Sequence, residues 1–157
     1  MPRHLQATPS GDGLRIGVAL ARFNQSVTDL LLAGTLAALA RHGVADDAID
    51  VATVPGAFEL PLCAQRLAAT GRYDALVCLG AVVRGETPHF DYVAAEAARG
   101  IADVARRHDL PIAFGVLTTD TIEQALARAG GERGNKGYEA AVTALEMVHV
   151  LRAVQRA

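Results

Sequence analysis

Short runs of mostly apolar residues alternate with longer helical patterns along this chain, and this alternation constrains the fold most strongly. The apolar runs are Leu14–Leu20, Ile49–Val54, Ala75–Leu79 and Pro111–Leu117. They are mostly continuous instead of alternating with polar residues, which is typical of strands covered on both faces. Helical spacing is expected over residues 28–41, 58–69, 92–107, 121–129 (with Asp120 as N-cap) and 137–153. The sequence therefore predicts an α/β fold with a parallel sheet and helices on both of its faces.

Length and composition limit the classes of protein that remain. A chain of 157 residues is expected to form one domain, and its 51% of hydrophobic residues suffices for a core. We expect a flexible lead over residues 1–13 and a single domain over residues 14–157. This composition is not that of a disordered chain, and no apolar run is long enough to span a membrane. The formal net charge of −2, without a basic block, gives no electrostatic attraction to nucleic acid or to lipid.

The cysteines and the first residues bear on the cellular compartment. Residues 1–13 contain no apolar segment of the kind found in secretory signals, so we expect a cytoplasmic protein. Cys63 and Cys78 both lie in apolar surroundings. They could form a disulfide, but without an export signal we interpret both as buried thiols.

The segments after the strands are the candidate sites, because ligands of parallel α/β sheets bind beyond the carboxyl ends of the strands. Phe23 follows the first strand and could stack on a planar heterocycle, although the spacing alone favours packing of this ring onto the core. Residues 55–61 follow the second strand and enter a helix whose first amides could meet a carbonyl or an anion. Glu59 could instead be only a favourable carboxylate in a first helical turn.

The segment after the third strand, Gly80–Asp91, is the most informative. It gathers arginine, glutamate, threonine, histidine and aspartate in one predicted loop after a strand that carries no charge. Histidine is the side chain best suited to proton transfer near neutral pH, so His89 is a candidate catalytic residue. A capped turn is the structural alternative for this histidine.

A glycine-rich segment near the last helix, Arg128–Gly137, contains three cations and four glycines and is suited to holding a phosphate. It is not a Walker A loop, because Gly137 stands where serine or threonine is required. The Gly11-x-Gly13 pair precedes a strand instead of following one, so it is not a dinucleotide-binding motif. The histidines and cysteines show no spacing typical of metal ligands, and no metal site is predicted.

The last predicted helix is apolar over more than one face. Such a helix is either buried in the core of its own domain or shared between its own sheet and a second subunit. With only four short strands to cover, we favour the second interpretation.

Five of these segments together resemble the lumazine synthase family of riboflavin biosynthesis, in order and over about residues 14–151. They are Ala21–Asn24, Pro55–Pro61, Gly80–Tyr92, Phe114–Thr118 and Gly134–Gly137. The resemblance implies a flavodoxin-like, three-layer αβα sandwich with a four-stranded, mainly parallel sheet. It also implies a transferase that condenses 5-amino-6-(D-ribitylamino)uracil with 3,4-dihydroxy-2-butanone 4-phosphate. The product would be 6,7-dimethyl-8-ribityllumazine, with release of phosphate and water, and neither a cofactor nor a metal would be needed.

The resemblance implies roles for individual residues as well. Phe23 would stack on the pyrimidine ring, His89 would transfer protons, and Arg128 would pair with the phosphate. Further substrate-binding residues would be Ala57, Phe58 and Glu59 at the ribityl chain, Ala81, Val82 and Val83 at the ring edge, Glu86 and Thr87 at the phosphate end, and Phe114 and Lys136. Phe114, Arg128 and Lys136 would come from a neighbouring subunit, because family members are pentamers with sites at subunit interfaces, and some assemble twelve pentamers into a shell.

Two alternatives stand beside the lumazine synthase family. Archaeal-type riboflavin synthase shares the architecture and dismutates two lumazines with a metal, but the Gly85–Asp91 and Gly134–Gly137 segments argue against it. A non-catalytic flavin- or lumazine-binding protein would be expected to lack the histidine or the phosphate cation, and both are present here. Glu132 is an acidic residue in the predicted phosphate segment, and no role is assigned to residues 131–133.

Overall fold

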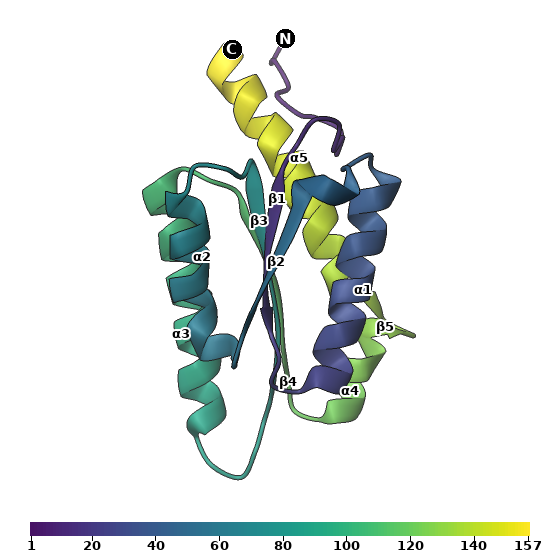
Figure 1. Ribbon diagram of the computed structural model, residues 1–157, viewed down its shortest axis with the longest axis vertical. Coiled ribbons are helices and arrows are strands. Elements are labelled where there is room, and N and C mark those ends of the chain that lie inside the picture. Colours follow the sequence, from purple (N-terminus) through teal and green to yellow (C-terminus); the bar gives the residue numbers. More distant parts are fainter.

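A parallel sheet of four strands forms the middle layer of the molecule (Figure 1) in a computed structural model that describes residues 1–157. The strands are β1 (Ile16–Ala21), β2 (Ile49–Val54), β3 (Ala75–Val83) and β4 (Ile112–Thr119). Their order is β2-β1-β3-β4, and all three pairings are parallel. The predicted α/β sandwich is confirmed.

Helices cover both faces of the sheet. On one face lie α2 (Leu60–Ala69) and α3 (His89–His108), and on the other lie α1 (Gln25–Arg41) and α5 (Lys136–Arg156), as Figure 1 shows. The smaller elements are η1 (Asp46–Ala48), η2 (Ala57–Glu59), α4 (Ile122–Ala127), β5 (Ala129–Gly131) and β6 (Gly134–Asn135). The antiparallel hairpin of β5 and β6, which the sequence did not indicate, lies on the side of α1 and α5.

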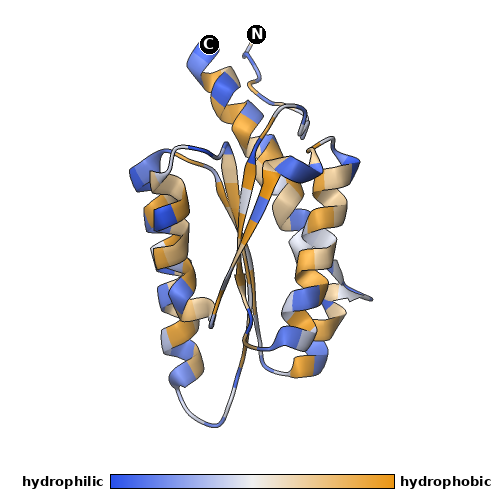
Figure 2. Cartoon of the chain, in the orientation of Figure 1, coloured by the Kyte–Doolittle hydropathy of each residue, from blue (hydrophilic) through white to orange (hydrophobic).

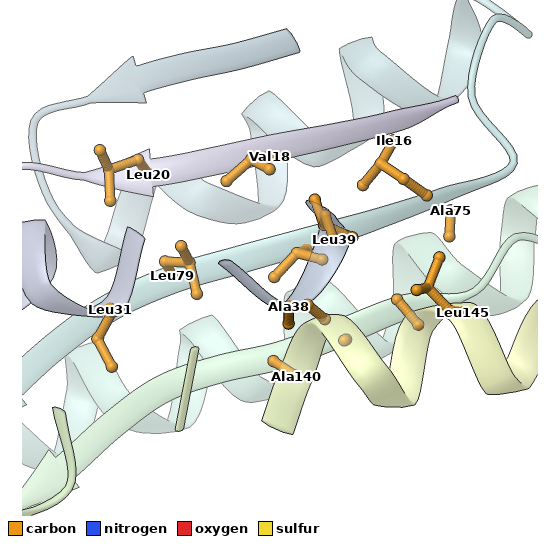
Figure 3. Close-up of a cluster of buried hydrophobic side chains, with 14 of the residues drawn as sticks. Ile16, Val18, Leu20, Leu31, Ala38, Leu39, Ala75, Leu79, Ala140 and Leu145 are labelled. Carbon is orange, nitrogen blue, oxygen red and sulfur yellow. The ribbon is translucent and has the colours of Figure 1, made fainter. Parts of the chain in front are cut away.

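The sheet separates two hydrophobic cores. The larger core packs β1 and β3 against α1 and α5, with Ile16, Leu39 and Leu145 fully buried (Figure 3). The smaller core packs the opposite face against α2 and α3 and includes Leu60 and Ile101. Figure 2 shows the apolar sides of the helices turned toward the sheet. Apolar burial on both faces explains why β1 and β3 are continuously hydrophobic.

Some boundaries differ from the sequence prediction. β3 continues through residues 80–83, which were expected in a loop, because these residues pair with β4 as far as Val83 opposite Thr119. α3 begins at His89 and not at residue 92, so this histidine lies in a helical turn and not in a loop. α4 is capped by Thr121 and not by Asp120, since the carboxylate of Asp120 accepts a hydrogen bond from Arg84 Nε.

Two expectations about burial were wrong in part. β2 is not covered on both faces, because it is an edge strand of the sheet, and Val51 on it is 42% exposed. Cys63 on α2 is only partly buried, whereas Cys78 on β3 is fully buried, and both are free thiols. Burial raises the pKa of the Cys78 thiol to about 12 and also raises the pKa of Cys63.

The two termini lie at the same end of the molecule (Figure 1). No helix or strand forms before β1, but the end of the lead is attached to the domain. The carbonyl of Ser10 lies 2.7 Å from Nε2 of His149, and the amide of Gly11 donates to the carbonyl of His42 at 2.7 Å. None of the helices is both long and apolar enough to cross a bilayer.

α1 and α5 approach each other closely at Gly137. A Cβ atom here would overlap the backbone carbonyl of Leu31, and the Gly137 carbonyl accepts a hydrogen bond of 2.8 Å from the buried Thr35 hydroxyl. Overpacking against backbone costs about 1–3 kcal/mol or more. We expect Gly137→Ala to lower the free energy of unfolding by at least about 2 kcal/mol in urea titrations. Gly85→Ala is the control, because a Cβ there meets nothing within 4 Å. Equal stability of the two variants would contradict this packing.

Candidate active site

A cavity of about 180 Å³ opens at the carboxyl ends of β1 and β3. The strand order reverses between these two strands, which is where doubly wound sheets bind their ligands. We call it the switch-point cavity. Its lining residues are Phe23, Asn24, Ala57, Ala81, Val82, Val83, Gly85, Thr87, His89, Phe90 and Val93. Seven of the predicted site residues are therefore brought together, from the end of β3 and from the segments that follow β1, β2 and β3.

Asn24 fixes the segment that carries Phe23. Its backbone has a φ of 64°, in the left-handed region that asparagine tolerates better than most residues. Its Nδ2 donates a hydrogen bond of 2.8 Å to the carbonyl of Ala81, and the amide of Phe23 donates to Pro55 at 3.0 Å. The Phe23 ring is 70% exposed, so it lies on the cavity wall without being packed into the core. The structure thus leaves this ring free to stack on a ligand.

The backbone of β3 is available along the cavity. β1 pairs with β3 only as far as Leu20 opposite Leu79, whereas β4 follows β3 to Val83. From Gly80 onward, the edge of β3 that faces β1 has no strand partner. Apart from the Ala81 carbonyl, which Asn24 engages, its amides and carbonyls can bond the polar edge of a planar ligand.

His89 is the first residue of α3, and its side chain is exposed and lines the switch-point cavity. Its amide lies 3.5 Å from the hydroxyl of Thr87, and its imidazole has no hydrogen-bond partner in the chain. Val93 lines the cavity from the next turn of the same helical face. The imidazole is therefore free to exchange a proton with a bound molecule.

Three predicted residues of this region do not line the cavity. Phe58 and Glu59 lie in η2 beside Ala57, with the Phe58 ring exposed, and Glu86 is exposed in the segment between β3 and α3. The sequence prediction missed Asn24, Gly85, Phe90 and Val93 as lining residues. The last three lie in or next to the segment that it had singled out, and helical spacing from His89 would have found Val93.

Arg84 connects the start of α3 to the end of β4. Its Nε donates to Asp120 at 2.9 Å, its Nη1 lies 3.6 Å from Asp91, and its guanidinium lies 4.4 Å from the centroid of the Phe90 ring. The hydrogen bond to Asp120 is the main cause of the raised pKa of Arg84. All the charged partners are largely exposed, so this arrangement orients the segment more than it stabilises the fold.

A second cavity, of about 550 Å³, lies along the carboxyl half of β4. We call it the cation cavity. It is lined by Val116, Leu117, Thr118, Thr119, Asp120, Gln124, Arg128, Arg133, Lys136 and Glu139. The structure joins Arg128 to Lys136 through a backbone hydrogen bond of 2.8 Å, from the Lys136 amide to the Arg128 carbonyl. Nη1 of Arg128 donates to the carbonyl of Gln124 at 3.1 Å, which fixes the direction of its side chain.

The two cavities have no lining residue in common. Phe114 lines neither of them, because it pairs with Cys78, five residues before Val83 at the end of β3. At roughly 3.3 Å per residue, this places Phe114 about 16 Å from the carboxyl edge of the sheet. A single chain therefore does not bring Phe114, Arg128 and Lys136 to the cavity that contains His89. No group of three or more histidine, cysteine, aspartate or glutamate side chains is arranged to hold a metal ion.

The fold is that of a flavodoxin-like α/β protein, with a cavity at the switch point that is lined by residues from the end of β3 and from the segments after β1, β2 and β3. A family model for 6,7-dimethyl-8-ribityllumazine synthase matches residues 13–152. A protein of Desulfatibacillum aliphaticivorans named 6,7-dimethyl-8-ribityllumazine synthase is 57% identical over 150 residues, which cover 96% of this chain and 97% of that protein. The chain belongs to the 6,7-dimethyl-8-ribityllumazine synthase family, and the family predicted from the five segments is confirmed.

Proposed function

We propose that this protein condenses 5-amino-6-(D-ribitylamino)uracil with 3,4-dihydroxy-2-butanone 4-phosphate to form 6,7-dimethyl-8-ribityllumazine, in the penultimate step of riboflavin biosynthesis. The observation that carries the proposal is the match of residues 13–152 to the family model, together with 57% identity to a relative of that name. The switch-point cavity supports it, because an exposed aromatic ring, free backbone groups and a histidine converge there.

The switch-point cavity would hold the aminouracil. Phe23 would stack on the pyrimidine ring, and the unpaired edge of β3 at residues 81–83 would bond the polar edge of that ring. The ribityl chain would contact η2, through Ala57, Phe58 and Glu59. Glu59 lies there beside the backbone amides at the start of a helical segment. Glu86 and Thr87, between β3 and α3, would lie toward the phosphate end.

The phosphate would be held by Arg128 and Lys136 of a neighbouring subunit, with Phe114 from the same neighbour. Sites for small molecules usually enclose roughly 300–1,000 Å³. The switch-point cavity has about 180 Å³ and contains no cation, while the cations line a separate cavity of the same chain. In a ring of subunits, the cation cavity of one chain could lie against the switch-point cavity of the next chain. Every site would then contain both the histidine and the cations. The exposed apolar residues Met147, Leu151 and Val154 on α5 are consistent with a shared helix face, and we propose a pentamer.

The chemistry fits these residues. The amine nitrogen attacks the ketone carbon and forms a carbinolamine, which loses water to give an imine. Loss of a proton from the neighbouring carbon and breaking of the carbon–oxygen bond to the phosphate then release inorganic phosphate and leave an enol, which becomes a ketone. The ribitylamino nitrogen attacks this ketone, and loss of a second water closes the ring of the lumazine. Each step moves a proton but needs no covalent bond to the protein, which suits the free imidazole of His89. The planar guanidinium of arginine can donate two hydrogen bonds to one phosphate, so Arg128 would stabilise the leaving group better than a lysine. No cofactor or metal takes part in the proposed reaction.

An absorbance assay with both substrates tests the proposal. We expect the purified protein to form the lumazine chromophore well above the uncatalysed rate. A folded, oligomeric protein that gives no acceleration would contradict the proposal and favour a binding protein. Metal-dependent conversion of added lumazine to riboflavin would favour the dismutase instead.

Two expectations accompany this proposal. The reaction would take place in the cytoplasm, where the substrates of a biosynthetic enzyme are made. The flexible lead over residues 1–13 and the single domain over residues 14–157 also stay predictions, and the family match from residue 13 is consistent with that boundary.

A further inference from the structure

Of the two charged side chains at the tip of the β5–β6 hairpin, one lines the cation cavity and the other does not. The tip consists of Glu132 and Arg133, between Gly131 and Gly134. Arg133 lines the cavity with Arg128 and Lys136, whereas Glu132 does not. Of the two adjacent charged residues at the tip, only the arginine lines the cavity. The local fold of the tip therefore selects which side chain faces the cavity.

Backbone contacts fix the tip in this position. The amide of Arg133 donates a hydrogen bond of 2.8 Å to the carbonyl of Ala127 at the end of α4. A Cβ at Gly131 would lie 2.8 Å from the Cα of Ala127, so the turn is packed directly on that helix end. On the other side, Asn135 accepts a hydrogen bond from the Tyr138 amide and donates one to the carbonyl of Leu30, which ties β6 to α5 and α1.

The charges around the cavity leave an excess of positive charge. Three cations line it, with the carboxylates of Asp120 and Glu139. Asp120 is already paired with Arg84 at 2.9 Å, and none of Arg128, Arg133 and Lys136 has a carboxylate within 4.0 Å. The three cations and Glu139 together give the cavity a net charge of about +2. A phosphate monoester carries about −1.5 to −2 charges at pH 7 and has three strong acceptor oxygens.

We propose that Arg133 is a third phosphate-binding residue, which contacts the phosphate of the butanone substrate together with Arg128 and Lys136. The inference rests on the proposed function and assigns a role within its site. The net charge of about +2 that the three cations and Glu139 give the cavity matches the charge of the phosphate dianion, and Arg133 is needed to reach it. The same group is released as inorganic phosphate, so Arg133 also binds that product.

Arg133→Gln tests this assignment, because glutamine keeps a polar side chain and removes the charge. We expect the KM for the butanone phosphate and the inhibition constant of inorganic phosphate to rise together, by roughly three- to tenfold. The KM for the aminouracil should change by less than about twofold, since its ring does not touch the cation cavity. Arg133→Lys should recover part of the loss, because it restores the charge without the planar fork.

Glu132→Gln is the matched control at the neighbouring position of the same tip. It changes the net charge by one unit without altering the lining of the cavity. We expect both phosphate-dependent constants to stay within about twofold of the parent protein. If surface charge alone mattered, Glu132→Gln would lower these constants about as much as Arg133→Gln raises them, and the assignment would be wrong.

Two further results would overturn the assignment while leaving the proposed function intact. One is an Arg133→Gln enzyme whose phosphate constants equal those of an active parent. The other is a variant that changes its oligomeric state in light scattering but keeps its affinity for inorganic phosphate in calorimetric titration. A parent protein that makes no lumazine would instead contradict the proposed function, and the same titration would still decide the role of Arg133.

Discussion

Arg128→Ala is expected to raise the KM for the butanone phosphate and to lower kcat/KM by roughly a hundredfold, because truncating one partner of a charged hydrogen-bonded pair costs about 2–5 kcal/mol. The side chain is held by the carbonyl of Gln124 at 3.1 Å and has no carboxylate partner, so its charge is available to a ligand. Steady-state kinetics with the phosphorylated substrate varied at saturating aminouracil measure the effect.

Arg66→Ala is a suitable control for this variant. Arg66 is an exposed arginine on α2 that lines neither cavity. Its removal changes the net charge equally and should leave the KM within about twofold. An unchanged KM in a folded Arg128→Ala protein would show that the phosphate is bound elsewhere.

His89→Ala is expected to reduce kcat by roughly ten- to a hundredfold and to leave the enzyme active. Holding two reactants side by side can supply most of the acceleration, whereas proton transfer by one positioned side chain adds a smaller factor. The KM values should change little, because the exposed imidazole has no partner in the chain and makes few packing contacts. Stopped-flow absorbance at saturating substrates measures the rate of lumazine formation directly.

The control is His108→Ala, at the last residue of the same helix and far from the cavity. It should keep the kcat of the parent protein within about twofold. Complete loss of turnover in a folded His89→Ala enzyme would show that proton transfer by His89 contributes more to the rate than holding the two reactants together does, which would contradict this prediction.

The sequence predicted the strands and helices well where hydrophobic patterns are long. β1 and β4 were found within two residues at each end, because continuous apolar runs indicate buried strands. The end of β3 was missed, since residues 80–83 are strand only through pairing with β4, which is a tertiary contact. The β5–β6 hairpin was missed for a similar reason. Its strands have three and two residues, too few to show any periodicity.

The sequence predicted which residues belong to the candidate site better than it predicted how they are placed. Chemistry after the strands and family resemblance selected Phe23, His89 and Arg128, and the topology of the sheet brings the first two into one cavity. No pattern in the sequence shows that Asn24 adopts a positive φ and bonds the Ala81 carbonyl, which orients the Phe23 segment. Arg128 lies in a separate cavity because of the position of α4 after the edge strand β4, which the sequence does not show either.

Subunit mixing tests directly whether two subunits complete each site. His89→Ala and Arg128→Ala chains would be unfolded together, refolded at a one-to-one ratio and assayed. If each site takes its histidine from one chain and its arginine from the next, about one site in four contains both side chains. We expect activity near a quarter of that of the parent protein, well above either variant alone. Activity no higher than the mean of the two separately refolded variants would mean that His89 and Arg128 act within one chain, and would contradict the shared site.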